Sequence, residues 1–149
     1  MPEDPSANLL MVCTGTGSAP FRAFTMRRQR LAMQSGGDML LFFGARTADS
    51  LPYFGPLNKV PERILKKHLV FSRIPDSPKE YVQDRMMVEH EAVANLLANP
   101  KTHIYICGLR GMEEGVERAF ANICESSGEP WIALRDAMRE EGRYHIETY

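Results

Sequence analysis

The chain has 149 residues, of which 44% are apolar and 25% are charged, and its formal net charge is −1. This length predicts one domain with a hydrophobic core, and the near-neutral charge argues against nucleic acid or an anionic membrane surface as a partner. No apolar run approaches the roughly 18 residues of a membrane span, and the opening M-P-E-D-P-S lacks the features of an export signal. Since the three cysteines cannot all pair and have no metal-binding spacing, we expect a cytoplasmic protein with reduced thiols and no metal site.

Five β-like runs alternate with helical patterns along the chain. The predicted strands begin 29 to 40 residues apart, about the length of one β-α unit, and cover residues 8–13, 39–44, 68–73, 103–107 and 143–148. The first four are nearly continuous in apolar or β-branched residues, as expected of strands buried on both faces. The alternation predicts an α/β fold with a parallel sheet and right-handed crossovers. Ligands of such sheets bind beyond the carboxyl ends of the strands.

Apolar residues recur at helical spacing between these runs. A first stripe contains Phe21, Phe24 and Leu31, and a later one contains Val88, Ala92, Val93, Leu96 and Leu97. The clearest stripe is formed by Met112, Val116, Ala119, Phe120, Ile123 and Cys124. A last helix is marked by Trp131, Leu134 and Met138 and is predicted to end at Gly142.

The first strand runs into a glycine turn, within the stretch N-L-L-M-V-C-T-G-T-G-S-A-P-F-R at residues 8–22. Glycines allow a sharp turn and a close backbone approach to a ligand, and the proline that follows suits the first position of a helix. A helix N-terminus at the end of a strand favours an anion such as a phosphate. The residues expected to border it are Thr14, Gly15, Thr16 and Gly17. The alternative is a structural strand–helix turn that binds nothing.

Cations follow the second and third strands. Arg46 comes after the second strand, where it is either a ligand contact or a solvated loop arginine. Ser72 and Arg73 end the third predicted strand, and Lys79 and Tyr81 follow. A guanidinium and an ammonium suit a phosphate, and the phenol could stack on adenine, so this cluster favours NADP over NAD. A charged loop with surface ion pairs is the alternative interpretation.

The fourth strand and the end of the chain supply the remaining candidates. Cys107 ends the fourth strand, where its side chain would face a nicotinamide ring, and Gly108 again allows backbone approach. A buried, inert cysteine is the alternative, and we see no base beside it that would make it a nucleophile. Glu147 and Tyr149 would share one side of the last strand. The terminal tyrosine is either a lid over a flat ring system or ordinary edge packing.

These pieces, in this order, resemble the C-terminal NADP-binding domain of the ferredoxin–NADP⁺ reductase family. The motifs that carry the resemblance are G-T-G-S-A-P-F-R, F-F-G-A-R-T-A-D-S-L-P-Y, F-S-R with K-E-Y-V-Q-D-R-M, I-C-G-L-R-G-M-E-E-G and the terminal E-T-Y. We therefore expect a Rossmann-like three-layer sandwich with a five-stranded parallel sheet in the order 3-2-1-4-5.

The resemblance also implies cofactors, partners and residue roles. NADPH would pass a hydride to FAD, and electrons would leave one at a time for a ferredoxin or oxygenase component. Residues 14–17 would border the pyrophosphate and nicotinamide, and the 2′-phospho-adenosine end would be held by Ser72, Arg73, Lys79 and Tyr81. The nicotinamide would be neighboured by Cys107, Gly108 and Leu109, with Glu147 organising the hydride-transfer site and Tyr149 stacking on the flavin. The family's FAD-binding β-barrel does not precede the first strand, so we expect a single domain, residues 1–149, that is an excised domain or a partial gene product.

Two other functions fit parts of the pattern. A flavodoxin-like FMN carrier also uses a similar first turn, but the Ser-Arg-Lys-Tyr cluster would have no purpose there. A self-sufficient dehydrogenase would need an acid or base beside the nicotinamide. The histidine at the start of the fourth strand, His103, lies at the wrong end for that role.

Overall fold

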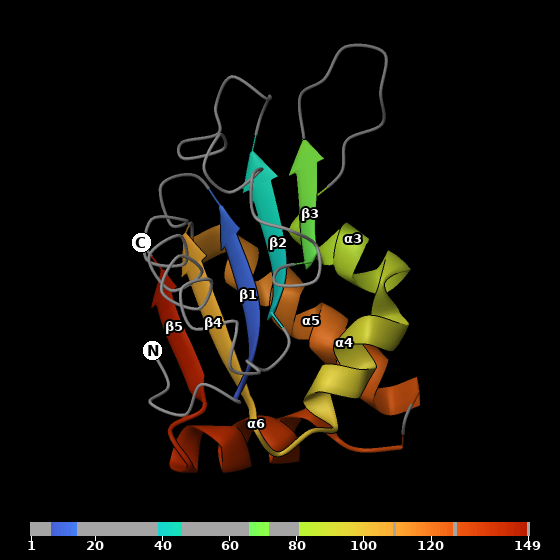
Figure 1. Ribbon diagram of the computed structural model, residues 1–149, viewed down its shortest axis with the longest axis vertical. Helices are drawn as coiled ribbons and strands as arrows, with labels where there is room; N and C mark the ends of the chain where they lie inside the picture. Colours follow the sequence, from blue (N-terminus) through green and yellow to red (C-terminus); the bar gives the residue numbers. More distant parts are fainter. Residues whose placement is uncertain are drawn as a thin grey trace, which may run out of the picture.

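A parallel five-stranded sheet forms the centre of the molecule (Figure 1). The computed structural model describes residues 7–14, 39–45, 66–71, 81–108, 110–126 and 128–148. The strands lie in the order β3-β2-β1-β4-β5, with bounds β1 Asn8–Thr14, β2 Met39–Ala45, β3 Lys66–Phe71, β4 Thr102–Gly108 and β5 Tyr144–Thr148. Every described strand pair is parallel, so all the strands end at the same edge of the sheet.

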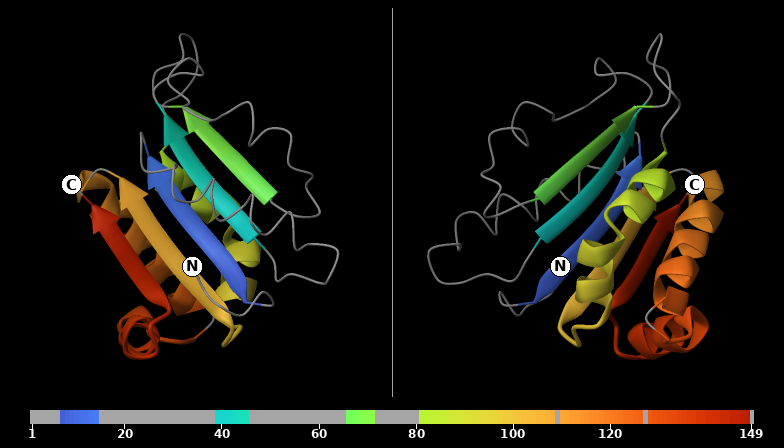
Figure 2. Two further views of the ribbon diagram at one scale, coloured as in Figure 1. Left: turned by 60° about the vertical axis from the view of Figure 1, so that its left-hand side comes forward. Right: turned by 90° about the vertical axis from the view of Figure 1, so that its right-hand side faces the viewer.

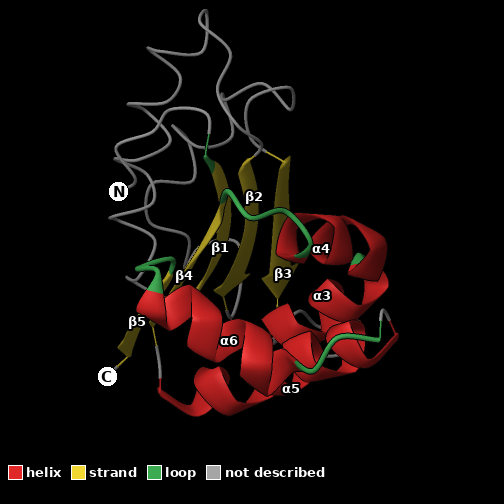
Figure 3. Ribbon diagram, turned by 90° about the horizontal axis from the view of Figure 1, so that it is seen from below, coloured by secondary structure: helices red, strands yellow, loops and turns green. Residues whose placement is uncertain are grey.

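The described helices cover one face of this sheet (Figure 2). They are α3 Val82–Val88, α4 His90–Leu97, α5 Arg110–Ser126 and α6 Trp131–Glu140. Seen from below, α6 runs beside α5 (Figure 3). The helix predicted around Phe21, Phe24 and Leu31, which would belong to the second helical layer, lies outside the described residues. None of the helices described is both long and apolar enough to cross a membrane.

The apolar stripe predicted for α5 is confirmed as the helical side of the core. All six of its residues are buried, and they pack with Leu10, Val12, Ile104 and Ile106 of the central strands. The next helix, α6, turns Trp131 and Met138 inward and leaves Leu134 partly buried. Its last helical residue is Glu140, and Gly142 follows in the left-handed region, at φ 72°. This packing fixes β4 and β5 against α5 and α6.

The prediction that Val88 lines a buried helix face was wrong. Val88 is 66% exposed, because it ends α3 and the chain turns at Glu89 before α4 begins. The predicted stripe thus joined the last residue of α3 to the buried face of α4. The separate helix α3, which begins directly after Tyr81, was not predicted.

The third strand also differs from its prediction. It begins two residues early, at Lys66, and ends at Phe71. Lys66 is exposed, and β3 lies at the edge of the described sheet. An edge strand tolerates an exposed lysine, and Lys66 lies outside the predicted range; within that range Val70 is buried and His68 is partly buried. Ser72 and Arg73, predicted as its last residues, lie outside the described residues.

Candidate functional site

The carboxyl edge of the sheet brings together residues from β1, β2 and β4. Thr14 ends β1 and pairs in register with Gly44 of β2. On its other side lies Gly108, the last residue of β4. A Cβ at Gly44 would lie 3.1 Å from Thr14 Cγ2, and one at Gly108 would lie 2.3 Å from Thr14 Oγ1. The threonine side chain therefore occupies the space that two glycines leave at the edge of the sheet.

Gly108 is required by its backbone as well as by this contact. Its φ is 136°, a conformation that side-chain-bearing residues rarely adopt, and a Cβ there would also lie 2.9 Å from the Thr14 carbonyl oxygen. Two residues further on, Arg110 begins the 17-residue helix α5. The structure thus places Gly108 and a helix start at the carboxyl ends of β1 and β4, between which the strand order reverses. This is the usual ligand position in such sheets. We call the edge formed by Thr14 and Gly108 the backbone cradle; a helix start beside it favours an anionic ligand.

A row of three side chains crosses the same edge on the opposite face of the sheet. Cys13 of β1 pairs in register with Cys107 of β4, which pairs with Glu147 of β5. Because register partners in parallel strands share a face, the two thiols and the carboxylate follow one another across three strands. Cys13 is fully buried and Cys107 is 9% exposed, whereas Glu147 is exposed. The structure therefore brings Cys107 and Glu147 together, as a shared site requires.

The electrostatics of this row favour a neutral thiol. Burial, and secondarily the Glu147 carboxylate, raises the pKa of Cys107 above the ordinary thiol value. Burial, and secondarily Cys107, raises the pKa of Cys13 well above it. A thiol held protonated is a poor nucleophile. Cys107 can therefore pack against a ligand or donate a weak hydrogen bond.

Aromatic side chains lie on the same face of the sheet, two residues before Cys107 and Glu147 in their strands. The rings of Tyr105 and His145 stack with centroids 4.5 Å apart, and His103 stacks on His145 at 6.3 Å. Burial lowers the pKa of His145 below the ordinary histidine value. Tyr105 and Cys13 are neighbours of the site that sequence reasoning missed. They could have been found by combining the alternation of side chains along each strand with the strand order. Cys13 lies next to Cys107, and Tyr105 next to His145, only because β4 lies between β1 and β5.

Tyr81 stands apart from the row, at the start of α3. Its side chain is 48% exposed, and its backbone N–H donates to the Asp84 carboxylate at 3.0 Å. The next residue, Val82, lies beside Gly44, since a Cβ at that glycine would approach Val82 Cγ1 to 3.0 Å. The phenol is thus available at the sheet edge near the end of β2.

The other candidate residues fall outside the part of the chain that the structure describes: Gly15, Thr16, Gly17, Arg46, Ser72, Arg73, Lys79, Leu109 and Tyr149. Their roles stay predictions. Among the described residues, no group of three or more histidine, cysteine, aspartate or glutamate side chains could hold a metal ion.

Comparison with known proteins gives a family and a set of relatives. Residues 11–118 match the family model described as the oxidoreductase NAD-binding domain. Over its whole length, the chain is 35% identical to ferredoxin–NADP reductases of Synechocystis sp. and Cyanophora paradoxa, and 32% identical to the leaf-type chloroplastic isozyme of Nicotiana tabacum. It spans 38% of the first relative and 44% of each of the other two. The chain therefore corresponds to less than half of the length of these relatives.

Proposed function

The chain belongs to the oxidoreductase NAD-binding domain family, and we propose on that basis that it is the NADP-binding module of a ferredoxin–NADP⁺ reductase-type flavoprotein. One observation carries the proposal. Thr14 and Gly108 form a backbone cradle beside the row of Cys107 and Glu147, at the carboxyl ends of β1 and β4, between which the strand order reverses. Its support from the relatives is their 31–35% identity over essentially the whole chain. NADPH supplies a hydride when bound, and a flavin accepts it.

The described residues would position the nicotinamide end of the cofactor. In this proposal, the cradle of Thr14 and Gly108 receives the cofactor backbone, and the protonated Cys107 thiol packs beside the nicotinamide. Glu147 lies next to that thiol and is exposed, so its carboxylate can orient a polar group of the ligand or exchange a proton with water. Leu109 and Tyr149 complete this end, the latter by stacking on the flavin ring.

The adenosine end would be recognised by its 2′-phosphate. Ser72, Arg73 and Lys79 are proposed to bind the phosphate, with Arg46 as an additional cation and Tyr81 stacking on the adenine. The pyrophosphate would rest on residues 15–17. Support for this part comes from the residue types and from the exposed position of Tyr81 at the start of α3.

We also propose that FAD is bound mainly by a further domain of a longer protein, and that these 149 residues by themselves do not turn over NADPH. From the resemblance of the sequence motifs, we propose that the longer protein is the reductase component of a benzoyl-CoA oxygenase. The electron acceptor in that case is an oxygenase component of aerobic benzoyl-CoA degradation, and a ferredoxin is the alternative. Reduction of such an oxygenase by NADPH, through the flavin-containing polypeptide, tests this assignment.

Calorimetric titration of the chain with 2′-phospho-AMP and with AMP tests the cofactor assignment. The two ligands differ only in the phosphate that distinguishes NADP from NAD. Charge-assisted hydrogen bonds contribute about 1.5–3 kcal/mol, so we expect at least about tenfold tighter binding of 2′-phospho-AMP. Equal affinities would remove the NADP preference, and tight binding of FMN with neither nucleotide would favour a flavodoxin-like carrier.

A further inference from the structure

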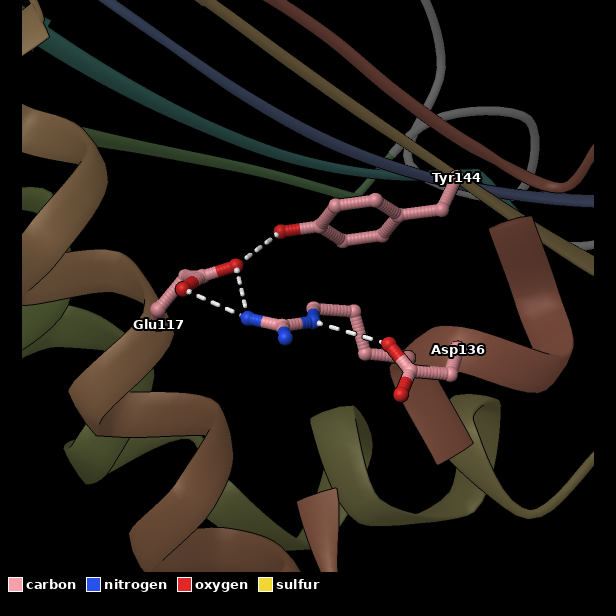
Figure 4. A network of polar contacts seen from close by, with 4 residues as sticks. Glu117, Asp136 and Tyr144 are labelled. Atoms are coloured by element: carbon pink, nitrogen blue, oxygen red, sulfur yellow. Dashed lines mark hydrogen bonds and ion pairs between the residues drawn. The ribbon is translucent and has the colours of Figure 1, made fainter. Parts of the chain in front are cut away.

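A polar network joins α5, α6 and β5 on the helical side of the sheet (Figure 4). The Tyr144 hydroxyl donates a hydrogen bond to Glu117 Oε1 at 2.8 Å. Arg135 Nη1 donates to both oxygens of the same carboxylate, at 3.3 and 3.2 Å, and its Nε lies 3.6 Å from Asp136. The side chains of Glu117 and Arg135 are 25% and 19% exposed, so this is not a surface ion pair. One carboxylate of α5 therefore holds groups from two other elements.

The same network holds the first residue of β5. Tyr144 is buried, with its ring edge-on to Trp131 at 5.8 Å and below the Arg139 guanidinium at 5.2 Å. Burial and the Glu117 carboxylate raise the pKa of Tyr144, so the phenol stays protonated and can donate. Just before it, the carbonyl of Arg143 accepts a hydrogen bond from the Ile104 N–H at 2.8 Å. The start of the strand is therefore anchored by a side chain and by the backbone.

The register of β5 depends on this anchor. In the described sheet, β5 is a five-residue edge strand that pairs only with β4. Tyr144 and Ile146 face the helices, and Ile146 is only partly buried. A slip of one residue would turn every side chain to the other face. It would move Glu147 away from Cys107. The Tyr144 anchor opposes this slip together with the neighbouring Arg143, whose Nη1 donates to the Thr102 carbonyl at 2.9 Å.

We propose that Glu117 is a positioning residue that holds Glu147 opposite Cys107 through Tyr144. Glu117 lies on α5, which begins two residues after Gly108 and so continues directly from the strand that carries Cys107. Tyr144 lies three residues before Glu147, about 10 Å along the strand. The Glu117 carboxylate thus connects the helix that follows β4 to the strand that carries Glu147. The importance of that row for hydride transfer rests on the proposed function, but the positioning itself does not.

Alkylation of Cys107 by iodoacetamide at pH 8, in the 149-residue chain and followed by peptide mass spectrometry, tests this positioning without cofactor. Only the thiolate form of Cys107 reacts with iodoacetamide. Burial and the Glu147 charge both raise the pKa of Cys107 and so disfavour that form. We expect Glu147→Gln to raise the rate about threefold, because loss of the carboxylate charge favours the thiolate. Tyr144→Phe and Glu117→Gln should raise it in the same direction. The matched control is Glu114→Gln, since Glu114 is 83% exposed on the same helix and also pairs with an arginine.

A double-mutant cycle separates positioning from simple loosening. In a Glu147→Gln background, Tyr144→Phe and Glu117→Gln should add nothing if they act by moving the Glu147 charge. Unchanged rates in folded variants, or a rate increase that persists without the Glu147 charge, would overturn the proposal. If Tyr144→Phe does not fold, Glu117→Gln alone decides, because it keeps the volume of the side chain but removes the charge that strengthens its bonds to Tyr144 and Arg135. Failure of 2′-phospho-AMP to bind would refute the proposed function and leave this result unaffected.

Discussion

Replacing Gly108 by alanine tests the geometry of the candidate site directly. The added Cβ would lie 2.3 Å from Thr14 Oγ1 and 2.9 Å from the Thr14 carbonyl oxygen, at a φ of 136°. An alanine in such a conformation costs about 1–3 kcal/mol, and an overpacked contact costs about another 1–3 kcal/mol. We therefore expect the free energy of unfolding to fall by about 2–6 kcal/mol. That is a large part of the roughly 5–15 kcal/mol typical of a domain.

Two other glycines provide matched controls. Gly128 has a φ of 82°, and a Cβ there would meet nothing within 4 Å, so Gly128→Ala measures backbone strain alone. Gly111 lies in α5 with open space around it and no positive φ, so Gly111→Ala should leave stability unchanged or raise it slightly. The three substitutions add the same methyl group and differ only in strain and contact.

Urea unfolding followed by circular dichroism measures all three variants. With a slope of about 2 kcal/mol per molar urea, Gly108→Ala should lower the midpoint by about 1–3 M. Adding Thr14→Ala should restore part of this loss, because it removes the Oγ1 contact but leaves the backbone contacts. If Gly108→Ala is no less stable than Gly128→Ala, then Thr14 does not lie against Gly108, and the cradle described above is not formed.

Three further predictions concern the core, pH and the cofactor. Phe120→Ala should cost about 3–5 kcal/mol of stability, since Phe120 is fully buried, whereas Ile132→Ala, at a 58% exposed position, should cost little in the same urea assay. Burial lowers the pKa of His145 in the folded state, so protonation favours unfolding. Its contribution to stability is therefore complete above the ordinary histidine pKa of about 6.5 and is lost as pH falls below it. A His145→Asn variant should show a weaker fall in stability between neutral and acidic pH, and an unchanged profile would contradict the shift. Arg73→Ala should weaken NADP binding about tenfold or more and NAD binding much less, as measured by calorimetry, and equal losses would contradict the 2′-phosphate role.

Local pattern was sufficient for those elements whose residues are buried in a regular way. The apolar runs of β1 and β2 were predicted with their starts correct and their ends within one residue. The six-residue stripe of α5 was buried as predicted, because a 3.6-residue period needs only one covered face. The pattern failed at Val88, which a chain turn leaves exposed, and it missed the first two residues of β3, where the exposed Lys66 lies on an edge strand.

The sequence by itself determined the alternation of strands and helices, the glycines of the carboxyl edge and the residue types of the site, because each depends on neighbours along the chain. Only the tertiary structure decided which residues meet across strands: Cys13 beside Cys107, Cys107 beside Glu147, and Glu117 beneath Tyr144. These pairs depend on strand order and register, which are set by how the connections cross the sheet. No repeating pattern in the sequence links residue 13 to 107 or residue 117 to 144. These residues become neighbours only when the strands and helices pack together.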